Sequence, residues 1–122
     1  MPDVYSTDLQ GYYTYPLQLV LAATLNAEVS GGIQIQQGYD FEVWQIQFIS
    51  TGIFSIIWGT TNVNFMSGFV RAANILGTGI FPHPLPYKPV FPRGSTIAVR
   101  VRNDAAPANT VDLAFEGRFI KS

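Results

Sequence analysis

The 122-residue sequence contains no cysteine. This absence excludes disulfides, thiolate metal ligands and cysteine nucleophiles, and it leaves the redox compartment open. Charge is also scarce, since 12% of the residues are charged, about half the usual share for a soluble domain, whereas 48% are hydrophobic. With so little charge to cover the surface, we expect some apolar surface to lie against a partner. The alternative is a monomer covered by uncharged Gln, Asn, Thr and Ser side chains.

Basic residues are few and form no cluster, and the formal net charge is -1. The sequence therefore predicts no nucleic-acid partner, because binding to phosphates needs a basic patch. The first ten residues, MPDVYSTDLQ, show neither a positive n-region nor an apolar core. No run approaches the roughly 18 apolar residues of a membrane span. We expect neither a cleaved signal peptide nor a membrane partner.

Side chains that could perform catalysis are equally sparse. The single histidine, His83, stands between two prolines and cannot supply the ligand set of a metal enzyme. We therefore predict no metal site and no cofactor, and we expect His83 to be an exposed or interface loop residue. Most of the eight carboxylates fall in predicted turns or on polar strand faces, although a facing pair such as Glu28 and Glu42 stays open. We predict no catalytic residue and expect that the protein is not an enzyme.

Hydrophobic residues alternate along much of the chain, and this period of two predicts half-buried strands. Two such strands cover residues 96–102 and 111–119. The turn-rich residues 103–109 between them are short enough to close an antiparallel hairpin, which would place Arg100 opposite Asp112.

Residues 39–50 predict a longer strand covered on both sides. In this strand Trp44, Ile46 and Phe48 share one face, so Trp44 is expected in the core, and the other face holds Phe41, Val43 and Ile49. Further strands are predicted at residues 33–36, between two turns, at 53–58, and more weakly at 62–71. Residues 15–25 fit a helix as well as a strand, and we prefer a strand because the neighbouring elements are all β.

Residues 77–95 contain five of the eight prolines. Proline cannot donate to a β ladder, so this segment is predicted to be a long extended crossover. The chain as a whole predicts an all-β fold, a two-sheet antiparallel β-sandwich of the jelly-roll type with about eight strands. An immunoglobulin-like sandwich is the alternative. An extended N-terminal arm, residues 1–14, would precede a single domain, residues 15–122.

The C-terminal two-thirds of the chain carries an ordered set of features. They are Tyr39-Asp40-Phe41-Glu42-Val43 leading into a hydrophobic strand, Asn74-Ile75-Leu76-Gly77, the crossover from Pro82 to Pro92, Phe91-Pro92-Arg93-Gly94-Ser95, Asn103, and the closing Phe115-Glu116-Gly117-Arg118. In this order they resemble the small jelly-roll cement and decoration proteins on the heads of tailed bacteriophages. The resemblance implies a virion structural protein on the capsid surface, made in the host cytoplasm. It also implies a homotrimer that binds between major capsid protein subunits and stabilises the head.

Two segments are candidates for the contact surface. Aromatic residues with polar tips are enriched where proteins meet proteins or sugars, and a proline-stiffened segment loses little entropy when it binds. The predicted protein–protein interface therefore consists of Tyr5, Tyr12, Tyr13, Tyr15, Phe81, His83, Leu85, Tyr87 and Phe91. The alternative function is a carbohydrate- or receptor-binding β-sandwich module, lectin-like or part of a phage fibre or tail. That alternative needs Trp44, Trp58 or the tyrosines to stand exposed as a stacking platform.

Overall fold

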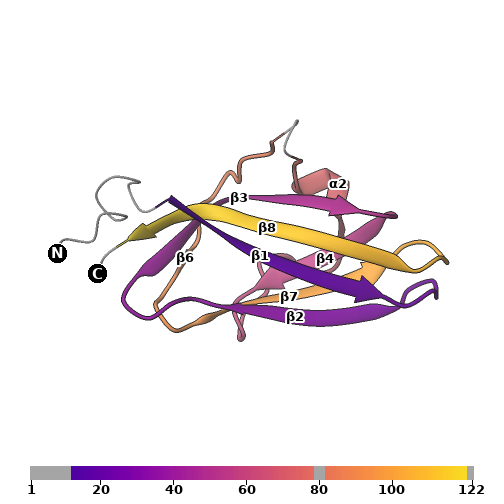
Figure 1. Ribbon diagram of the computed structural model, residues 1–122, viewed down its shortest axis with the longest axis horizontal. Helices are drawn as coiled ribbons and strands as arrows, with labels where there is room; N and C mark the ends of the chain where they lie inside the picture. Colours follow the sequence, from indigo (N-terminus) through magenta and orange to yellow (C-terminus); the bar gives the residue numbers. More distant parts are fainter. Residues whose placement is uncertain (1–11, 79–81, 121–122) are drawn as a thin grey trace.

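In a computed structural model of the chain, which describes residues 12–78 and 82–120, two four-stranded antiparallel sheets pack face to face (Figure 1). A four-residue helix, α2 (Ala72–Ile75), follows the fifth strand. The strands are β1 (Tyr12–Leu21), β2 (Glu28–Gln34), β3 (Asp40–Ser50), β4 (Phe54–Gly59), β5 (Val70–Arg71), β6 (Val90–Phe91), β7 (Thr96–Asn103) and β8 (Asn109–Ile120).

The strand order is β1-β8-β3-β6 in one sheet and β2-β7-β4-β5 in the other. The pairs β1–β8, β2–β7, β3–β6 and β4–β5 are those of one long antiparallel hairpin. Rolling this hairpin into two layers adds the pairs β8–β3 and β7–β4. This connectivity is a jelly roll, so the predicted fold class is confirmed and the immunoglobulin-like alternative is not.

The core lies between the sheets and is built from the inward residues of each strand. Its largest fully buried side chains are those of Phe41, Phe54, Phe91 and Phe115. Removing such a side chain from water contributes about 1.5–3 kcal/mol. In the segment 15–25, β1 places Tyr15 and Leu19 inward, so the preference for strand over helix is confirmed as far as Leu21, and residues 22–25 lie in the bend that follows.

The predicted hairpin between the last two long strands is wrong. β7 pairs with β2 and β4, whereas β8 pairs with β1 and β3, so the two strands lie in different sheets. The segment between them is an arch from one sheet to the other. Asn103, fully buried at the start of the arch, donates from Nδ2 to the carbonyls of Ala22 and Pro107, at 3.0 and 2.8 Å. These bonds satisfy two loop carbonyls and tie the arch to the residue that follows β1.

The two faces predicted for residues 39–50 are wrong beyond Val43, because β3 contains a bulge. The register with β8 shifts between Val43 and Gln45, which makes Trp44 the extra residue of the strand. Phe41, Val43, Ile46 and Phe48 therefore face the core, whereas Trp44 turns to the outer face and Ile49 is 73% exposed. A bulge re-aims side chains in this way.

Two shorter strand predictions also change. β2 begins at Glu28 and runs through Gly31 and Gly32, which were expected to form a turn. A Cβ on Gly31 would lie 2.7 Å from a methyl carbon of Leu19, so a larger residue here would require the Leu19 side chain to shift. Of residues 62–71, only β5 (Val70–Arg71) is a strand.

Candidate binding surfaces

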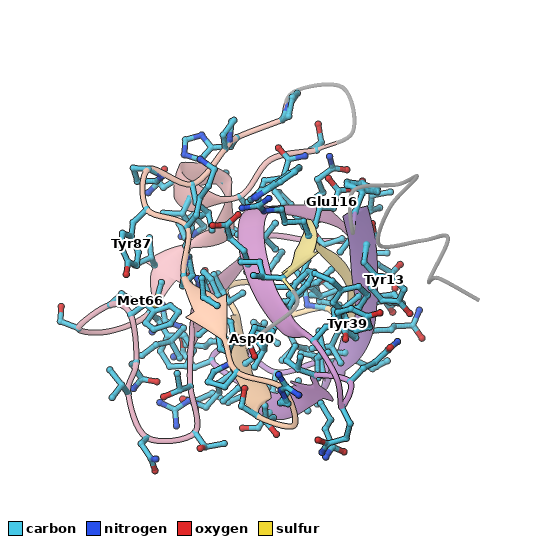
Figure 2. All side chains as sticks on the ribbon, turned by 90° about the vertical axis from the view of Figure 1, so that its left-hand side faces the viewer. Tyr13, Tyr39, Asp40, Met66, Tyr87 and Glu116 are labelled. Carbon is cyan, nitrogen blue, oxygen red and sulfur yellow. The ribbon has the colours of Figure 1, made fainter. Side chains whose placement is uncertain are left out.

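The predicted interface residues form two separate groups. Tyr12, Tyr13 and Tyr15 lie at the start of β1, whereas His83, Leu85, Tyr87 and Phe91 lie on the proline-rich segment. Figure 2 looks onto the end of the sandwich where β1 begins, and it shows Tyr13 and Tyr87 on opposite sides of that end. The other two predicted residues, Tyr5 and Phe81, lie outside the described residues.

The tyrosines of β1 mostly close the end of the sandwich. Residues 12–14, expected in the arm, pair with β8 and belong to the sheet. Tyr15 is buried edge-on against Phe41, with ring centroids 4.9 Å apart, and its hydroxyl accepts a hydrogen bond from the backbone N–H of Gln36 at 3.1 Å. Burial raises the pKa of Tyr15. Tyr13 packs on Phe119, so Tyr12 alone of the three projects onto the outer face of the sheet.

The proline-rich segment is fastened to the edge of β3. The Leu85 N–H donates to the Trp44 carbonyl at 2.8 Å, and the Val43 N–H donates to the Pro89 carbonyl at 2.9 Å. These bonds occupy backbone groups that an edge strand would otherwise leave open. The segment is therefore extended, as predicted, but it lies along the sheet. Phe91 belongs to β6 and is buried in the core, which removes it from the predicted interface.

A pocket of about 320 Å³ opens between this segment and the loop that follows β4. Phe65 and Met66 line it from the loop, and His83, Leu85 and Tyr87 line it from the proline-rich segment. Figure 2 shows Met66 and Tyr87 side by side. The Tyr87 side chain is 78% exposed, and Phe65 is also exposed. We call Phe65, Met66, Leu85 and Tyr87 the crossover patch.

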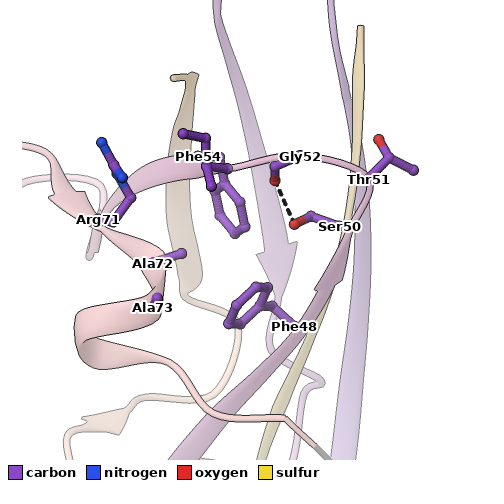
Figure 3. Close-up of a pocket in the computed structure, with 9 residues that line it drawn as sticks. Phe48, Ser50, Thr51, Gly52, Phe54, Arg71, Ala72 and Ala73 are labelled. Carbon is purple, nitrogen blue, oxygen red and sulfur yellow. Dashed lines mark hydrogen bonds between the residues drawn. The ribbon is translucent and has the colours of Figure 1, made fainter. Parts of the chain in front are cut away.

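A second pocket, of about 240 Å³, lies near α2 at the far end of β3 (Figure 3). Phe48 and Phe54, whose rings meet edge to face, form much of its lining. Its polar groups are already engaged, because Ser50 Oγ donates to the Gly52 carbonyl at 2.7 Å and Arg71 forms an ion pair with Asp104. This pocket is therefore lined mainly by apolar side chains, and the polar groups of Ser50 and Arg71 already bind other parts of the chain.

The outer face of the sheet β1-β8-β3 carries Trp44, which is partly exposed. Trp44 Nε1 donates to Glu42 Oε1 at 2.8 Å, and Arg118 Nε donates to the same oxygen at 3.1 Å. The bond from Trp44, together with the bond and charge of Arg118, lowers the pKa of Glu42 against the opposing effect of burial. Tyr12 lies beside Trp44, with ring centroids 6.4 Å apart and planes inclined by 47°. The other tryptophan, Trp58, is buried in the core.

The carboxylate pair left open by the sequence does not form. Glu28 lies on β2 and pairs with Arg100, whereas Glu42 lies on β3 in the other sheet and pairs with Arg118. Within residues 12–78 and 82–120, no group of three His, Cys, Asp or Glu side chains could hold a metal ion. No helix in the same residues is long and apolar enough to cross a membrane.

Comparison of the chain with protein-family models, curated proteins and solved structures found no match.

Sequence reasoning found part of these surfaces. It selected His83, Leu85 and Tyr87 because of the prolines around them, but it missed Phe65 and Met66. These two follow a run of polar loop residues, Thr60 to Asn64, interrupted only by Val63, so an apolar pair inside a loop was the available signal. The surroundings of Trp44 were missed because the bulge was not predicted.

Proposed function

We propose that the chain is a virion structural protein, a capsid decoration or cement protein that binds between major capsid protein subunits and stabilises the head. The observation that carries the proposal is the crossover patch, an exposed apolar and aromatic surface with a pocket at its centre. An exposed aromatic and apolar surface that is hollowed by a pocket is typical of a contact site.

The composition of the patch suits a protein partner. Aromatic residues and methionine are enriched in the centres of protein interfaces, and a side chain inserted into a pocket is a typical energetic hot spot. The patch is also held in place, since Leu85 is hydrogen-bonded to β3 and prolines stand on either side of it. Binding therefore costs little additional ordering of the segment.

The partner follows from the resemblance to phage head proteins together with the fold. Jelly rolls occur in viral capsids and in lectins, so the fold alone does not choose between these roles. The ordered features that carry the resemblance, from Tyr39 to Arg118, favour the capsid, and they favour a homotrimer. Arrangement around a symmetry axis would let each copy present its crossover patch to a neighbouring capsid subunit.

The test uses the purified chain and capsids assembled from the major capsid protein of the same virus. We expect a trimeric mass in solution, co-sedimentation with capsids, and capsids that withstand higher temperature when the protein is bound. Tyr87→Ser and Phe65→Ser should each weaken binding by about tenfold or more, whereas Val20→Ser, at an exposed position of β1, should leave it unchanged. Binding to tails or fibres in place of capsids, or full binding by the Tyr87→Ser variant, would contradict the proposal.

A further inference from the structure

We propose that the outer face of the β1-β8-β3 sheet contains a second site, which binds a neutral oligosaccharide on Tyr12 and Trp44. The crossover patch contains neither of these side chains. The site therefore has a function of its own, whether or not the chain decorates a capsid.

A bulge in β3 leaves Trp44 on the outer face and moves the following core residue, Ile46, inward. Strict alternation along β3 would place residue 44 on the outer face and residue 46 with it, and the bulge allows Ile46 to enter the core while Trp44 and Gln45 both stay outside. The bulge requires Gly117 in β8, because a Cβ at this position would overlap the carbonyl oxygen of Glu42. A bulge of this kind commonly lies next to a functional site, where it directs a side chain.

One hydrogen bond fixes the indole of Trp44, and a second holds the carboxylate that accepts it. The indole Nε1–H donates to Glu42 at 2.8 Å, and Arg118 holds the same carboxylate at 3.1 Å. A ring with a fixed orientation loses little freedom when a ligand stacks on it. The indole is therefore preorganised as a platform.

Tyr12 extends this platform. It is 49% exposed, and its ring centroid lies 6.4 Å from that of Trp44 at an inclination of 47°. This separation is too small for a sugar ring to enter between the two aromatic rings. A pyranose would instead rest its apolar C–H face on one ring and contact the other ring with its edge, an arrangement suited to aromatics with one apolar face and one polar tip.

Planar polar groups continue the surface across the sheet. Gln45 and Gln47 both donate from Nε2 to Glu116 Oε1, and Gln18 donates to Asp112 at 2.8 Å. Amides and carboxylates held in this way keep further donors and acceptors for ligand hydroxyl groups. A few placed polar groups beside an apolar platform are the usual composition of a small-molecule site.

The charge of this face discriminates between acidic and neutral sugars. The face carries Glu42, Asp112 and Glu116 against Arg118, and the charge of Lys88 also acts on Glu42, so the carboxylates outnumber the cations by one. An acidic sugar would be repelled by this balance, whereas an uncharged hexose oligosaccharide would not. The site is therefore assigned to neutral glycans.

The two tryptophans make the site measurable. In a Trp58→Phe background the remaining tryptophan, Trp44, reports on the surface alone, because Trp58 is the buried one. The probes are tetrasaccharides of glucose, galactose, mannose and N-acetylglucosamine, with sialyllactose as the acidic comparison. We expect a saturable change in Trp44 fluorescence with at least one neutral tetrasaccharide and none with sialyllactose.

Calorimetry on the unmodified chain and on surface variants gives the decisive comparison. Trp44→Ala and Tyr12→Ala should each weaken the affinity for the best probe by about tenfold or more, and Ile49→Ser, farther along the outer face of β3, should retain it. Tyr87→Ser should also retain it, which separates this site from the crossover patch. The proposal is overturned if no neutral tetrasaccharide binds, if sialyllactose binds more tightly, or if folded Trp44→Ala and Tyr12→Ala variants bind as well as the unmodified chain.

Discussion

The two sheets use the charged side chains of their outer surfaces differently. Just after β7, the side chain of Asp104 is only 6% exposed and accepts hydrogen bonds from Ser55, Arg71 and Arg102. The guanidinium groups of Arg100 and Arg102 lie over the ring of Phe69, at 5.3 and 4.9 Å. Ion pairing and cation–π contacts on this side therefore hold the chain's own loop onto the sheet.

On the other sheet, the carboxylates are partly exposed and hold flat side chains in place. Glu42 orients Trp44, and Glu116 orients two glutamines. The charged groups on the β2-β7-β4-β5 sheet thus bind other parts of the chain. Those on the β1-β8-β3-β6 sheet orient side chains that face outward. The difference indicates where the molecule is built for its own stability and where it is built for contact.

The largest expected effect concerns the bulge that creates the presenting face. Gly117→Ala would force β3 and β8 apart at Glu42, so we expect a loss of about 3 kcal/mol in the free energy of unfolding. Urea unfolding measures this loss, and the fluorescence of Trp44 should change with it. Gly68→Ala, where a Cβ would meet nothing within 4 Å, is the matched control and should be nearly neutral. Equal stability of the two variants would show that the bulge is not needed.

Removing one charge from each sheet tests the comparison directly. Asp104→Asn removes a nearly buried carboxylate from two arginines, and we expect it to cost about 2 kcal/mol. Glu42→Gln on the more open face should cost less than about 1 kcal/mol. Thermal or urea unfolding of the two variants provides the measurement, and a reversed order would break the distinction between the faces.

Acid should reduce the contribution of Asp104 to the free energy of unfolding. Burial raises the pKa of Asp104, but the hydrogen bonds from Ser55 and Arg102 and the charges of Arg102 and Arg71 outweigh it, so the pKa lies below its ordinary value. A depressed pKa means that the unfolded chain takes up the proton first. The stabilisation is therefore complete above a pH of about 4 and is lost as the pH falls further. Urea unfolding at a series of pH values should show the difference between the unmodified chain and Asp104→Asn shrinking in this range; a constant difference would contradict the assignment.

The smallest effect is expected for the exposed pair between Glu28 and Arg100. Their atoms are 3.6 Å apart and both side chains are about half exposed. Pairs of this kind contribute little to stability. Glu28→Gln should leave the unfolding midpoint within experimental error, and a clear loss would mean that this pair also helps to fasten the sheet.

The alternating pattern was enough to predict the β-sandwich, because inward and outward positions of a strand follow directly from a period of two. It could not distinguish a hairpin from an arch, since both join two alternating strands by a short polar segment. The arch depends on the buried side chain of Asn103 and its distant carbonyl partner at Ala22. The bulge likewise depends on Gly117, which is far from Trp44 in sequence and adjacent to β3 in space.

For the candidate surfaces too, the local features could be predicted and the contacts between distant segments could not. Prolines are visible in the sequence, so Leu85 and Tyr87 could be selected from it. The contribution of Phe65 and Met66 to the same pocket arises only when the loop after β4 folds against the proline-rich segment. Trp44 was expected in the core because alternation without a bulge was assumed.

Prolines stand at both edges of the β1-β8-β3-β6 sheet. Pro16 lies in the middle of β1, the edge strand on one side, and the segment containing Pro84 and Pro89 runs along β3 on the other. A proline at an edge denies an incoming strand one of the donors it needs. This sheet therefore resists growth by addition of strands from other molecules, the process by which bare sheet edges extend into fibrils.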